Sequence, residues 1–303
     1  MKIVIAGGSG FLGDALGQAF ADDQHEVVVL TRGAARPPAD SRRRLVAWTP
    51  NGDAGAWASE LNGATAVVNL AGESIAAKRW SAVQKLRILD SRILATRSLV
   101  AAIGTAASPP VVFVSGSAVG YYGPRGDDIA TEDAPAGTDF LADVCVRWEA
   151  EASHATTPRT RVALVRTGLV LDRRGGALPR MLPPFWFGAG GPVGSGQQYW
   201  PWIHLRDWVD LVRWIVRSAN VSGPINVTAP TPATNAEFAR TLGRVLRRPA
   251  VLPAPAFALR LLLGEMADAL LLSGQRAVPA KAERLGFNFR YRDLDDALRS
   301  IFR

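Results

Sequence analysis

The N-terminal segment places a short apolar run directly before three closely spaced glycines. Residues 2–6 read Lys-Ile-Val-Ile-Ala, and Gly7, Gly10 and Gly13 follow at intervals of three residues. The apolar run predicts a buried strand, and the pattern from Phe11 to about residue 21 predicts a helix. Glycine permits a positive φ and a close backbone approach, and a helix N-terminus attracts phosphate. This order of elements therefore predicts a dinucleotide site. The alternative is a glycine turn that holds no ligand.

The residues after the second predicted strand, 26–30, indicate which dinucleotide would bind. Thr31 and Arg32 follow that strand, and no Asp or Glu lies between residues 27 and 39, whereas an NAD site usually has an acid there. A guanidinium can instead bind a 2′-phosphate through charge-assisted hydrogen bonds worth about 1.5–3 kcal/mol each. Arg36 and Arg42–Arg44 add positive charge nearby. We therefore predict NADP(H) as the cofactor; the alternative is that Arg32 is an ordinary surface arginine.

Composition narrows the class of partner. The 303 residues are 48% hydrophobic and 20% charged, which is typical of a globular protein. The net charge of +8 comes from 31 arginines and 4 lysines spread along the whole chain, so we expect no nucleic-acid partner. Cys145 is the only cysteine and the three histidines lie far apart, so no metal site is expected.

The sequence also bears on location. The first predicted strand starts at residue 2, which leaves no room for a signal peptide. The most apolar late segment, 257–272, contains Arg260, Glu265 and Asp268 and is too short to span a bilayer. We therefore expect a cytoplasmic protein without a membrane partner.

Strand-like and helical patterns alternate through the first half of the chain. Strands are predicted at 2–6, 26–30, 45–48, 66–70, 111–115 and 161–166. The clearest helices are predicted at 81–103 and 139–156. Such alternation predicts an α/β fold of the Rossmann type, a doubly wound parallel sheet with helices on both faces.

The composition changes after residue 167, where glycine-rich and proline-punctuated segments begin. We predict that residues 1–167 and 200–228 form the NADP-binding Rossmann domain. Residues 168–199 and 229–303 then form a smaller, mainly helical substrate region, interleaved with the first. His204 and Asp207 precede a predicted helix and are interpreted as its cap.

Several short motifs resemble the extended short-chain dehydrogenase/reductase superfamily along nearly the whole chain. Within it, the chain resembles the atypical "epimerase family" branch, which is NAD(P)-dependent, epimerase/dehydratase-like and carries its own C-terminal segment. The matching motifs are Gly-Gly-Ser-Gly-Phe-Leu-Gly at 7–13, Leu-Thr-Arg at 30–32, Asn-Leu-Ala-Gly-Glu at 69–73, Arg-Trp at 79–80, Ser-Arg at 91–92, Trp-Glu at 148–149, Arg-Thr-Gly at 166–168, Gly-Gly-Pro-Val-Gly-Ser-Gly-Gln at 190–197, Trp-Ile-His at 202–204 and Leu-Gly-Phe-Asn-Phe at 285–289.

The motifs and the resemblance together imply a set of cofactor-binding residues and a mode of assembly. The candidate cofactor residues are Gly7, Ser9, Gly10, Phe11, Leu12, Gly13, Thr31, Arg32, Leu70, Ala71, Gly72, Arg92, Ser115 and Arg166. The resemblance also implies a homodimer formed through the helices at 81–103 and 139–156, an expectation by analogy only.

The chain departs from the superfamily in its catalytic residues. Typical members use a Ser together with a Tyr-x-x-x-Lys pair, in which the lysine lowers the pKa of the tyrosine so that it can act as a base. A glutamate commonly follows four residues after that lysine, and Glu149 matches it. Counting back places Cys145 at the lysine position and Leu141 at the tyrosine position, so the usual base is missing.

Four residues remain as candidate catalytic groups. Ser117 fits the superfamily's serine, at the end of the fifth predicted strand; its alternative role is to satisfy backbone groups there. Tyr121 and Tyr122 follow and could offer a phenol, although an aromatic pair also serves packing. Glu73 comes after the fourth strand, where a partly desolvated carboxylate suits proton transfer; it could equally be a helix N-cap or pair with Lys78 or Arg79.

Two hypotheses for function follow. The first is an NADP(H)-dependent oxidoreductase or epimerase acting on a small polar substrate of the sugar-nucleotide kind. The second is an NADP(H)-binding regulatory protein that has lost catalysis, for example one linked to cell division, as the loss of the Tyr-x-x-x-Lys pair suggests.

Overall fold

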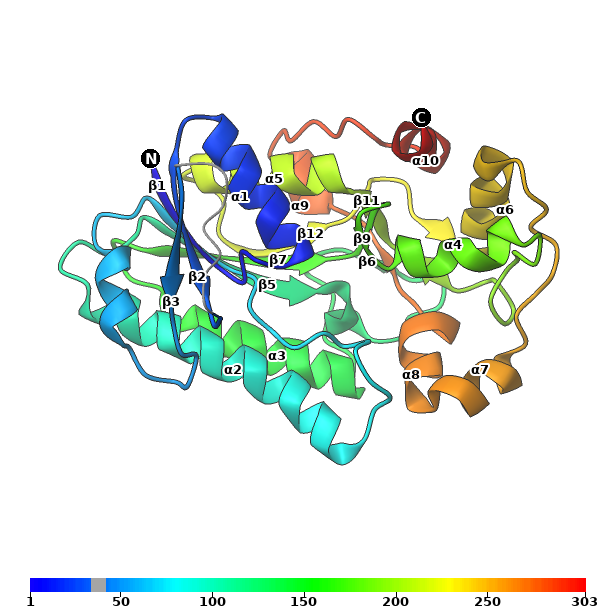
Figure 1. Cartoon of the computed structure of the whole chain (residues 1–303), viewed down its shortest axis with the longest axis horizontal. Helices are drawn as coiled ribbons and strands as arrows, with labels where there is room; N and C mark the ends of the chain where they lie inside the picture. The colour runs from blue at the N-terminus through cyan, green and yellow to red at the C-terminus, as the bar shows by residue number, and fades with distance from the viewer. Residues whose placement is uncertain (34–41) are drawn as a thin grey trace.

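A seven-stranded, all-parallel sheet runs through the molecule, as the computed structural model of residues 1–33 and 42–303 shows (Figure 1). The strand order is β12-β7-β5-β4-β1-β2-β3. The strands are β1 (Lys2–Ala6), β2 (Glu26–Thr31), β3 (Arg43–Ala47), β4 (Ala66–Asn69), β5 (Val112–Ala118), β7 (Arg161–Thr167) and β12 (Gly223–Val227). The predicted Rossmann-type, doubly wound α/β fold is confirmed.

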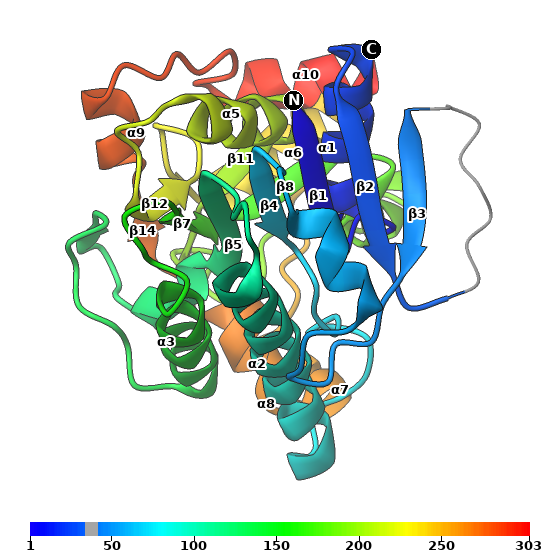
Figure 2. The same cartoon turned by 90° about the vertical axis from the view of Figure 1, so that its left-hand side faces the viewer.

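Helices cover both faces of this sheet (Figure 2). On one face lie α1 (Phe11–Asp22) and α5 (Leu205–Arg217), and on the other lie α2 (Ala82–Thr105), α3 (Phe140–Ser153) and the short η1 (Ala56–Leu61). Because the central strands β1, β2 and β4 are buried on both faces, their sequences are almost continuously apolar rather than alternating, whereas the edge strand β3 begins with two arginines and has no buried residue.

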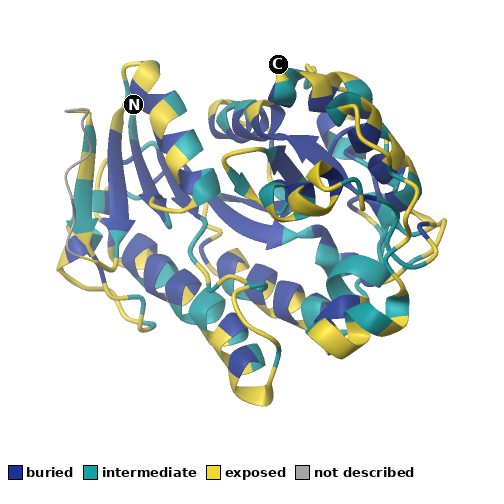
Figure 3. Ribbon diagram, turned by 45° about the vertical axis from the view of Figure 1, so that its right-hand side comes forward, coloured by how far each residue is buried: buried dark blue, intermediate teal, exposed yellow. Residues whose placement is uncertain are grey.

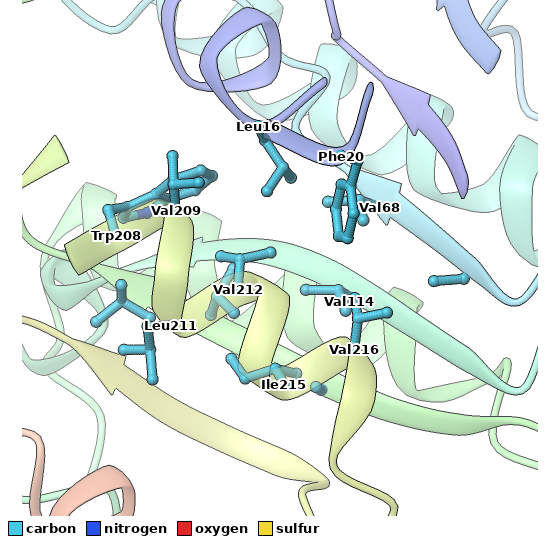
Figure 4. Packing of buried hydrophobic residues seen from close by; sticks show 14 of the residues in the cluster. Leu16, Phe20, Val68, Val114, Trp208, Val209, Leu211, Val212, Ile215 and Val216 are labelled. Carbon is cyan, nitrogen blue, oxygen red and sulfur yellow. The ribbon is translucent and has the colours of Figure 1, made fainter. Parts of the chain in front are cut away.

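The first strand illustrates how the two cores arise. Ile3 and Ile5 of β1 pack on the α1 and α5 side, whereas Val4 and Ala6 pack on the α2 side, because neighbouring strand residues point to opposite faces. On the α1 and α5 side, Leu16 and Phe20 of α1 belong to the same buried cluster as Trp208, Val212 and Ile215 of α5 (Figure 4).

The strand order reverses between β1 and β4. From β1 the chain builds outward to β2 and β3, then returns to add β4, β5, β7 and β12 on the other side. In doubly wound sheets, ligands bind at the carboxyl ends of the strands beside such a reversal. A ligand is therefore expected at the carboxyl ends of β1, β2, β4 and β5.

The remaining elements lie outside the seven-stranded sheet and its flanking helices, and part of them shares a third buried cluster (Figure 3). In chain order they are η2 (Val119–Tyr122), β6 (Ile129–Ala130), β8 (Leu169–Asp172), β9 (Gly175–Gly176), α4 (Leu178–Trp186), β10 (Tyr199–Trp200), β11 (Trp202–His204), β13 (Ala233–Thr234), α6 (Asn235–Leu246), α7 (Ala256–Leu263), α8 (Glu265–Ala267), η3 (Asp268–Leu272), β14 (Arg276–Ala277), α9 (Ala280–Arg284) and α10 (Leu294–Phe302). Within the described residues, no helix is long and apolar enough to cross a bilayer.

Two strand boundaries differ by more than one residue from the sequence prediction. The third strand starts two residues earlier than expected, because Arg43 and Arg44 pair with Val27 and Val28 of β2. The fifth continues to Ala118 rather than ending at residue 115, because it pairs with β7 as far as Thr167. Ser117 therefore lies within a buried strand, and not in the loop after it.

Candidate dinucleotide site

The glycine turn is shaped to admit a phosphate group. Gly7 has φ +78°, and a Cβ there would lie 2.7 Å from the Leu70 carbonyl carbon, so the turn lies directly against the end of β4. Gly10 caps α1 without any side-chain hydrogen bond, which leaves N–H groups at the helix start free. A Cβ at Gly10 would meet only the Gly7 oxygen, at 3.3 Å, so the space above the helix start is open. These features fit the pyrophosphate of a dinucleotide.

The other predicted residues of the turn have different surroundings. Ser9 is exposed and Leu12 is half-buried. The Phe11 ring lies on β9, since a Cβ at Gly175 would come within 2.4 Å of it. Phe11 thus connects the glycine turn to the segment after β7, a contact that the sequence did not predict.

Arg32 follows the carboxyl end of β2 directly and is exposed. Its guanidinium makes no hydrogen bond or ion pair with any described residue, whereas Arg43 is paired with Asp14 and Arg44 with Glu60. Thr31, beside it, accepts a hydrogen bond from the Gly33 amide at 3.5 Å. Arg36 lies outside the described residues. Arg32 is therefore a free cation where a 2′-phosphate would need one.

Beyond β4, the backbone of Glu73 is held while its side chain is not. The Glu73 amide donates to the Ser91 hydroxyl at 2.9 Å, and Arg92 Nη1 donates to the Glu73 carbonyl at 3.0 Å. The Glu73 carboxylate is half-buried and accepts no hydrogen bond from the described residues, so neither Lys78 nor Arg79 pairs with it. Leu70, Ala71 and Gly72 form the short link before it.

Ser117 belongs to a buried polar network. Its hydroxyl donates to Glu149 Oε1 at 2.6 Å, and Arg166 donates from Nε and Nη2 to both oxygens of the same carboxylate, each at 2.8 Å. Arg166 Nη1 also donates to the Tyr122 hydroxyl and to the Glu132 carbonyl. Ser115 is fully buried, and its hydroxyl donates only to the Gly116 carbonyl, at 3.4 Å.

The two tyrosines after β5 have opposite environments. The Tyr122 hydroxyl donates to Asn226 Oδ1 at 2.7 Å, and burial raises the Tyr122 pKa to about 12. Tyr121 is half-buried, and its hydroxyl makes no hydrogen bond with the described residues. The Tyr121 ring lies over Arg166, with 3.5 Å between Cζ and the ring centroid. Of the two hydroxyls, only that of Tyr121 is free.

Neither position of the missing pair carries a base. Leu141 is apolar, and the Cys145 thiol is buried, donating to the Ala118 carbonyl at 3.7 Å. Burial raises the Cys145 pKa to about 11, so the thiol is neutral at physiological pH. Among the described residues, no cluster of His, Cys, Asp or Glu could hold a metal ion.

Two residues of the buried polar network around Ser117 were not predicted from the sequence. Asn226 stands in an apolar strand, a polar residue among buried neighbours, and that pattern could have revealed it. Glu132 accepts from the Asn226 and Lys281 amides, yet its local sequence gives no signal.

An all-parallel sheet with an open glycine turn at its reversal point defines a Rossmann-type dinucleotide-binding protein. Comparison with known proteins gives the family: residues 3–228 match the NAD dependent epimerase/dehydratase family, and the chain belongs to it. Residues 254–301 match a domain of unknown function, DUF1731. The predicted membership of the "epimerase family" branch, with its own C-terminal segment, is confirmed.

Named relatives cover almost the whole chain. The epimerase family protein YfhF of Bacillus subtilis is 40% identical, with 99% of this chain and 98% of the relative covered. The human epimerase family protein SDR39U1 is 37% identical, with 99% of both chains covered. An Arabidopsis thaliana homologue of SDR39U1, 42% identical over 99% of this chain and 86% of its own length, is named chloroplastic. Family membership therefore does not fix the compartment, and a cytoplasmic location stays a prediction.

Solved structures agree on the fold. Human SDR39U1 (isoform 2), crystallised with NADPH, superposes with a TM-score of 0.91 at 36% identity, with 99% of both chains covered. The UDP-glucuronic acid 4-epimerase of Bacillus cereus superposes at 0.80 with only 16% identity, over 100% of this chain and 98% of that one, a likeness of fold alone.

Proposed function

We propose that this protein binds NADP(H) and is an oxidoreductase or epimerase acting on a small polar substrate. The observation that carries the cofactor assignment is the unpaired Arg32 guanidinium at the end of β2, on the adenosine side of the glycine turn. The presence of NADPH in the human SDR39U1 structure supports the same choice.

Each part of the site has a role in this proposal. When bound, NADP(H) supplies a hydride donor or acceptor at its nicotinamide ring. The Gly7–Gly13 turn and the free amides of α1 bind the pyrophosphate, and Arg32 binds the 2′-phosphate. The link formed by Leu70, Ala71 and Gly72 lines the nicotinamide side, because β4 lies across the reversal point from β2.

A proton carrier is needed besides the cofactor, and two groups are free to serve. The Glu73 carboxylate and the Tyr121 hydroxyl have no partner among the described residues, so either can exchange a proton with a substrate. The Ser117 hydrogen is donated to Glu149, so toward a substrate Ser117 could only accept a hydrogen bond. Tyr122 and Arg166 then act as positioning residues, because both are held within the buried network.

The cofactor assignment is tested by titrating the protein with NADPH and NADH, using calorimetry. We expect tighter binding of NADPH, and an Arg32→Ala variant that loses about 10- to 100-fold in NADPH affinity, the equivalent of one or two charge-assisted bonds. Its affinity for NADH should change little. Arg87→Ala is the matched control, since Arg87 is another exposed arginine without a partner among the described residues. Equal affinity for both cofactors in every variant would refute the assignment.

A specific observation favours the second hypothesis, a cofactor-binding regulatory protein. Leu141 and Cys145 occupy the positions of the usual base, and the Ser117 and Tyr122 hydroxyls are bonded internally. The two hypotheses differ in the effect of Glu73→Gln and Tyr121→Phe. In an enzyme, at least one of these changes abolishes turnover while NADPH still binds; turnover is measured as NADPH oxidation with carbonyl substrates and as epimerisation of sugar nucleotides, which consumes no cofactor. A regulatory protein binds NADPH but turns over none of these substrates.

A further inference from the structure

A cavity away from the candidate dinucleotide site has more cationic than anionic side chains in its wall. It has a volume of about 220 Å³ and lies where three segments meet: the turn that joins β8 to β9, the junction of β11 with α5, and the last turn of α10 (Figure 1). Three arginines and one aspartate line it, together with His204 and Ser300. None of its lining residues belongs to the glycine turn or to the segments that directly follow β1, β2, β4 and β5, so the cavity is separate from the dinucleotide site.

Two of the three arginines have no partner. Asp172 accepts from Arg174 Nε at 3.0 Å and from Arg174 Nη2 at 3.2 Å, so these two charges offset each other. The guanidinium groups of Arg173 and Arg206 are exposed and form no hydrogen bond or ion pair with any described residue. Three guanidiniums and one carboxylate therefore leave a formal charge of +2 on the wall of the cavity.

The histidine in the wall is neutral and fixed in place. His204 is 4% exposed; its Nδ1 accepts from the Arg206 amide at 2.9 Å, and its Nε2 lies 3.1 Å from the Ser300 hydroxyl. Burial lowers the His204 pKa to about 4, so the ring is uncharged at physiological pH. Asp207, in the first turn of α5, does not line the cavity, and its carboxylate accepts from the amides of residues 290–291. The charge of the wall thus comes from the arginines.

The size and the charge of the cavity together indicate its ligand. Sites for drug-sized ligands usually have volumes of about 300–1,000 Å³, so this cavity suits a smaller molecule. A charge of +2 is matched by a dianion. The guanidinium group presents its N–H donors as a planar fork that fits two oxygens of a phosphate, and arginine is therefore preferred where phosphate is recognised. A monocarboxylate would bring one negative charge and leave the second cation unmatched.

We propose that this cavity is a second anion-binding site, in which Arg173 and Arg206 bind a small phosphate dianion, either inorganic phosphate or the phosphate group of a monoester. The site does not depend on the cofactor proposed above, because the two sites share no residue. It is nevertheless close to the glycine turn. The turn that carries Arg173 leads into β9, where a Cβ at Gly175 would come within 2.4 Å of the Phe11 ring.

The experiment titrates the protein with sodium phosphate by calorimetry, at constant pH and at an ionic strength kept constant with chloride. We expect saturable binding to the wild-type protein. Arg173→Met and Arg206→Met should each weaken it by about 10- to 100-fold, the equivalent of one or two charge-assisted hydrogen bonds. Arg32→Ala in the dinucleotide site and Arg87→Met, which removes an exposed arginine from α2, should change it by less than about twofold, since distant charges are screened.

Asp172→Asn provides a change of the opposite sign. Asparagine keeps a side-chain oxygen for the Arg174 amide, which donates to Asp172 Oδ1 at 2.7 Å, but it removes the negative charge and so releases the Arg174 guanidinium. Phosphate should then bind about 3- to 10-fold more tightly. A general disturbance of the fold would not raise the affinity.

A second titration, with glycerol 3-phosphate, distinguishes the two sources of the phosphate group. Tighter binding of glycerol 3-phosphate than of inorganic phosphate supports a monoester as the ligand. Tighter binding of inorganic phosphate supports the free ion.

Four results would overturn the proposal. Neither ligand binds saturably up to about 20 mM; or Arg173→Met and Arg206→Met leave the affinity unchanged, so that phosphate binds elsewhere. In the third result, Arg32→Ala or Arg87→Met causes an equal loss, and in the fourth, Asp172→Asn lowers the affinity. If one arginine variant does not fold, the other gives the same test. None of these results bears on the proposed function, because no dinucleotide is present.

Discussion

At the scale of single residues, the absence of a side chain at Gly13 is required both for the packing of α1 against the glycine turn and for the shape of the candidate dinucleotide site. A Cβ at this position would lie 2.4 Å from the Gly7 carbonyl oxygen and 2.6 Å from the Gly8 Cα. Both contacts are with backbone, which cannot rotate aside as a side chain can. The first helix would have to move away from the glycine turn, and the free amides at its start would move with it.

We therefore expect Gly13→Ala to lower the free energy of unfolding by about 1–3 kcal/mol, the usual cost of overpacking, and to weaken NADPH binding. Gly104→Ala is the matched control, because Gly104 is exposed near the end of α2 and nothing lies within 4 Å of a Cβ there. The control should be neutral or stabilised by up to about 1 kcal/mol, since alanine favours helix. Urea denaturation measures both, and equal effects would contradict the prediction.

The same scale shows what a sequence can reveal about a site. The glycine turn and Arg32 could be predicted because their meaning depends on neighbours a few residues away. The partner of Ser117 could not, because Glu149 lies 32 residues further along the chain. The partner of Tyr122, Asn226, is 104 residues away. Which hydroxyls are free and which are bonded is decided by such distant contacts.

At the scale of elements, the ion pair between Glu149 of α3 and Arg166 of β7 connects a helix to the sheet behind the candidate site. The two side chains are 9% and 4% exposed, and the pair is bidentate. Replacing a buried ion pair by apolar residues can be neutral, but removing one partner leaves the other charge buried and unpaired.

Glu149→Gln should consequently destabilise the protein by about 3–5 kcal/mol, the typical result of breaking a buried pair. The control is Glu151→Gln on the same helix, whose partner Arg97 is 52% exposed, so that pair should contribute no more than about 1 kcal/mol. Thermal or urea unfolding of the two variants measures the difference. Similar losses in the free energy of unfolding would show that burial does not determine how much the Glu149–Arg166 pair contributes to stability.

Element positions were predictable from the apolar pattern, but their ends were not. The apolar run at residues 111–115 indicated a strand, whereas the last three residues of that strand, to Ala118, depend on pairing with β7. The short strands β6 and β14 pair with each other across a long stretch of chain, and two-residue elements carry no periodicity to detect.

At the scale of the whole molecule, His204 helps to join the C-terminal helix to the layer of helices on the sheet. Its Nδ1 accepts from the Arg206 amide at 2.9 Å at the start of α5, so its Nε2 carries the hydrogen that faces Ser300 of α10, 3.1 Å away. The Tyr291 ring stacks on it with centroids 4.0 Å apart. The imidazole is thus neutral, with each nitrogen in a defined role.

This arrangement makes stability depend on pH. Burial lowers the His204 pKa to about 4 from an ordinary value of 6.5. As pH falls, the unfolded chain takes up a proton before the folded one, so this contribution is complete above about pH 6.5 and is lost progressively toward pH 4. The total is about 3 kcal/mol. Asp207 titrates in the opposite sense because burial raises its pKa, so the His204 effect must be isolated by comparison.

His204→Asn provides that comparison, since asparagine keeps an acceptor for the start of α5 but does not titrate. Denaturation of both proteins between about pH 7.5 and about pH 4.5 cancels the part that Asp207 and the other groups share. We expect the wild-type advantage over the variant to shrink by about 2–3 kcal/mol across that range. If the difference in the free energy of unfolding between the two proteins stays constant with pH, His204 is not held neutral between α5 and α10. Any loss of stability in acid would then come from the titration of other groups.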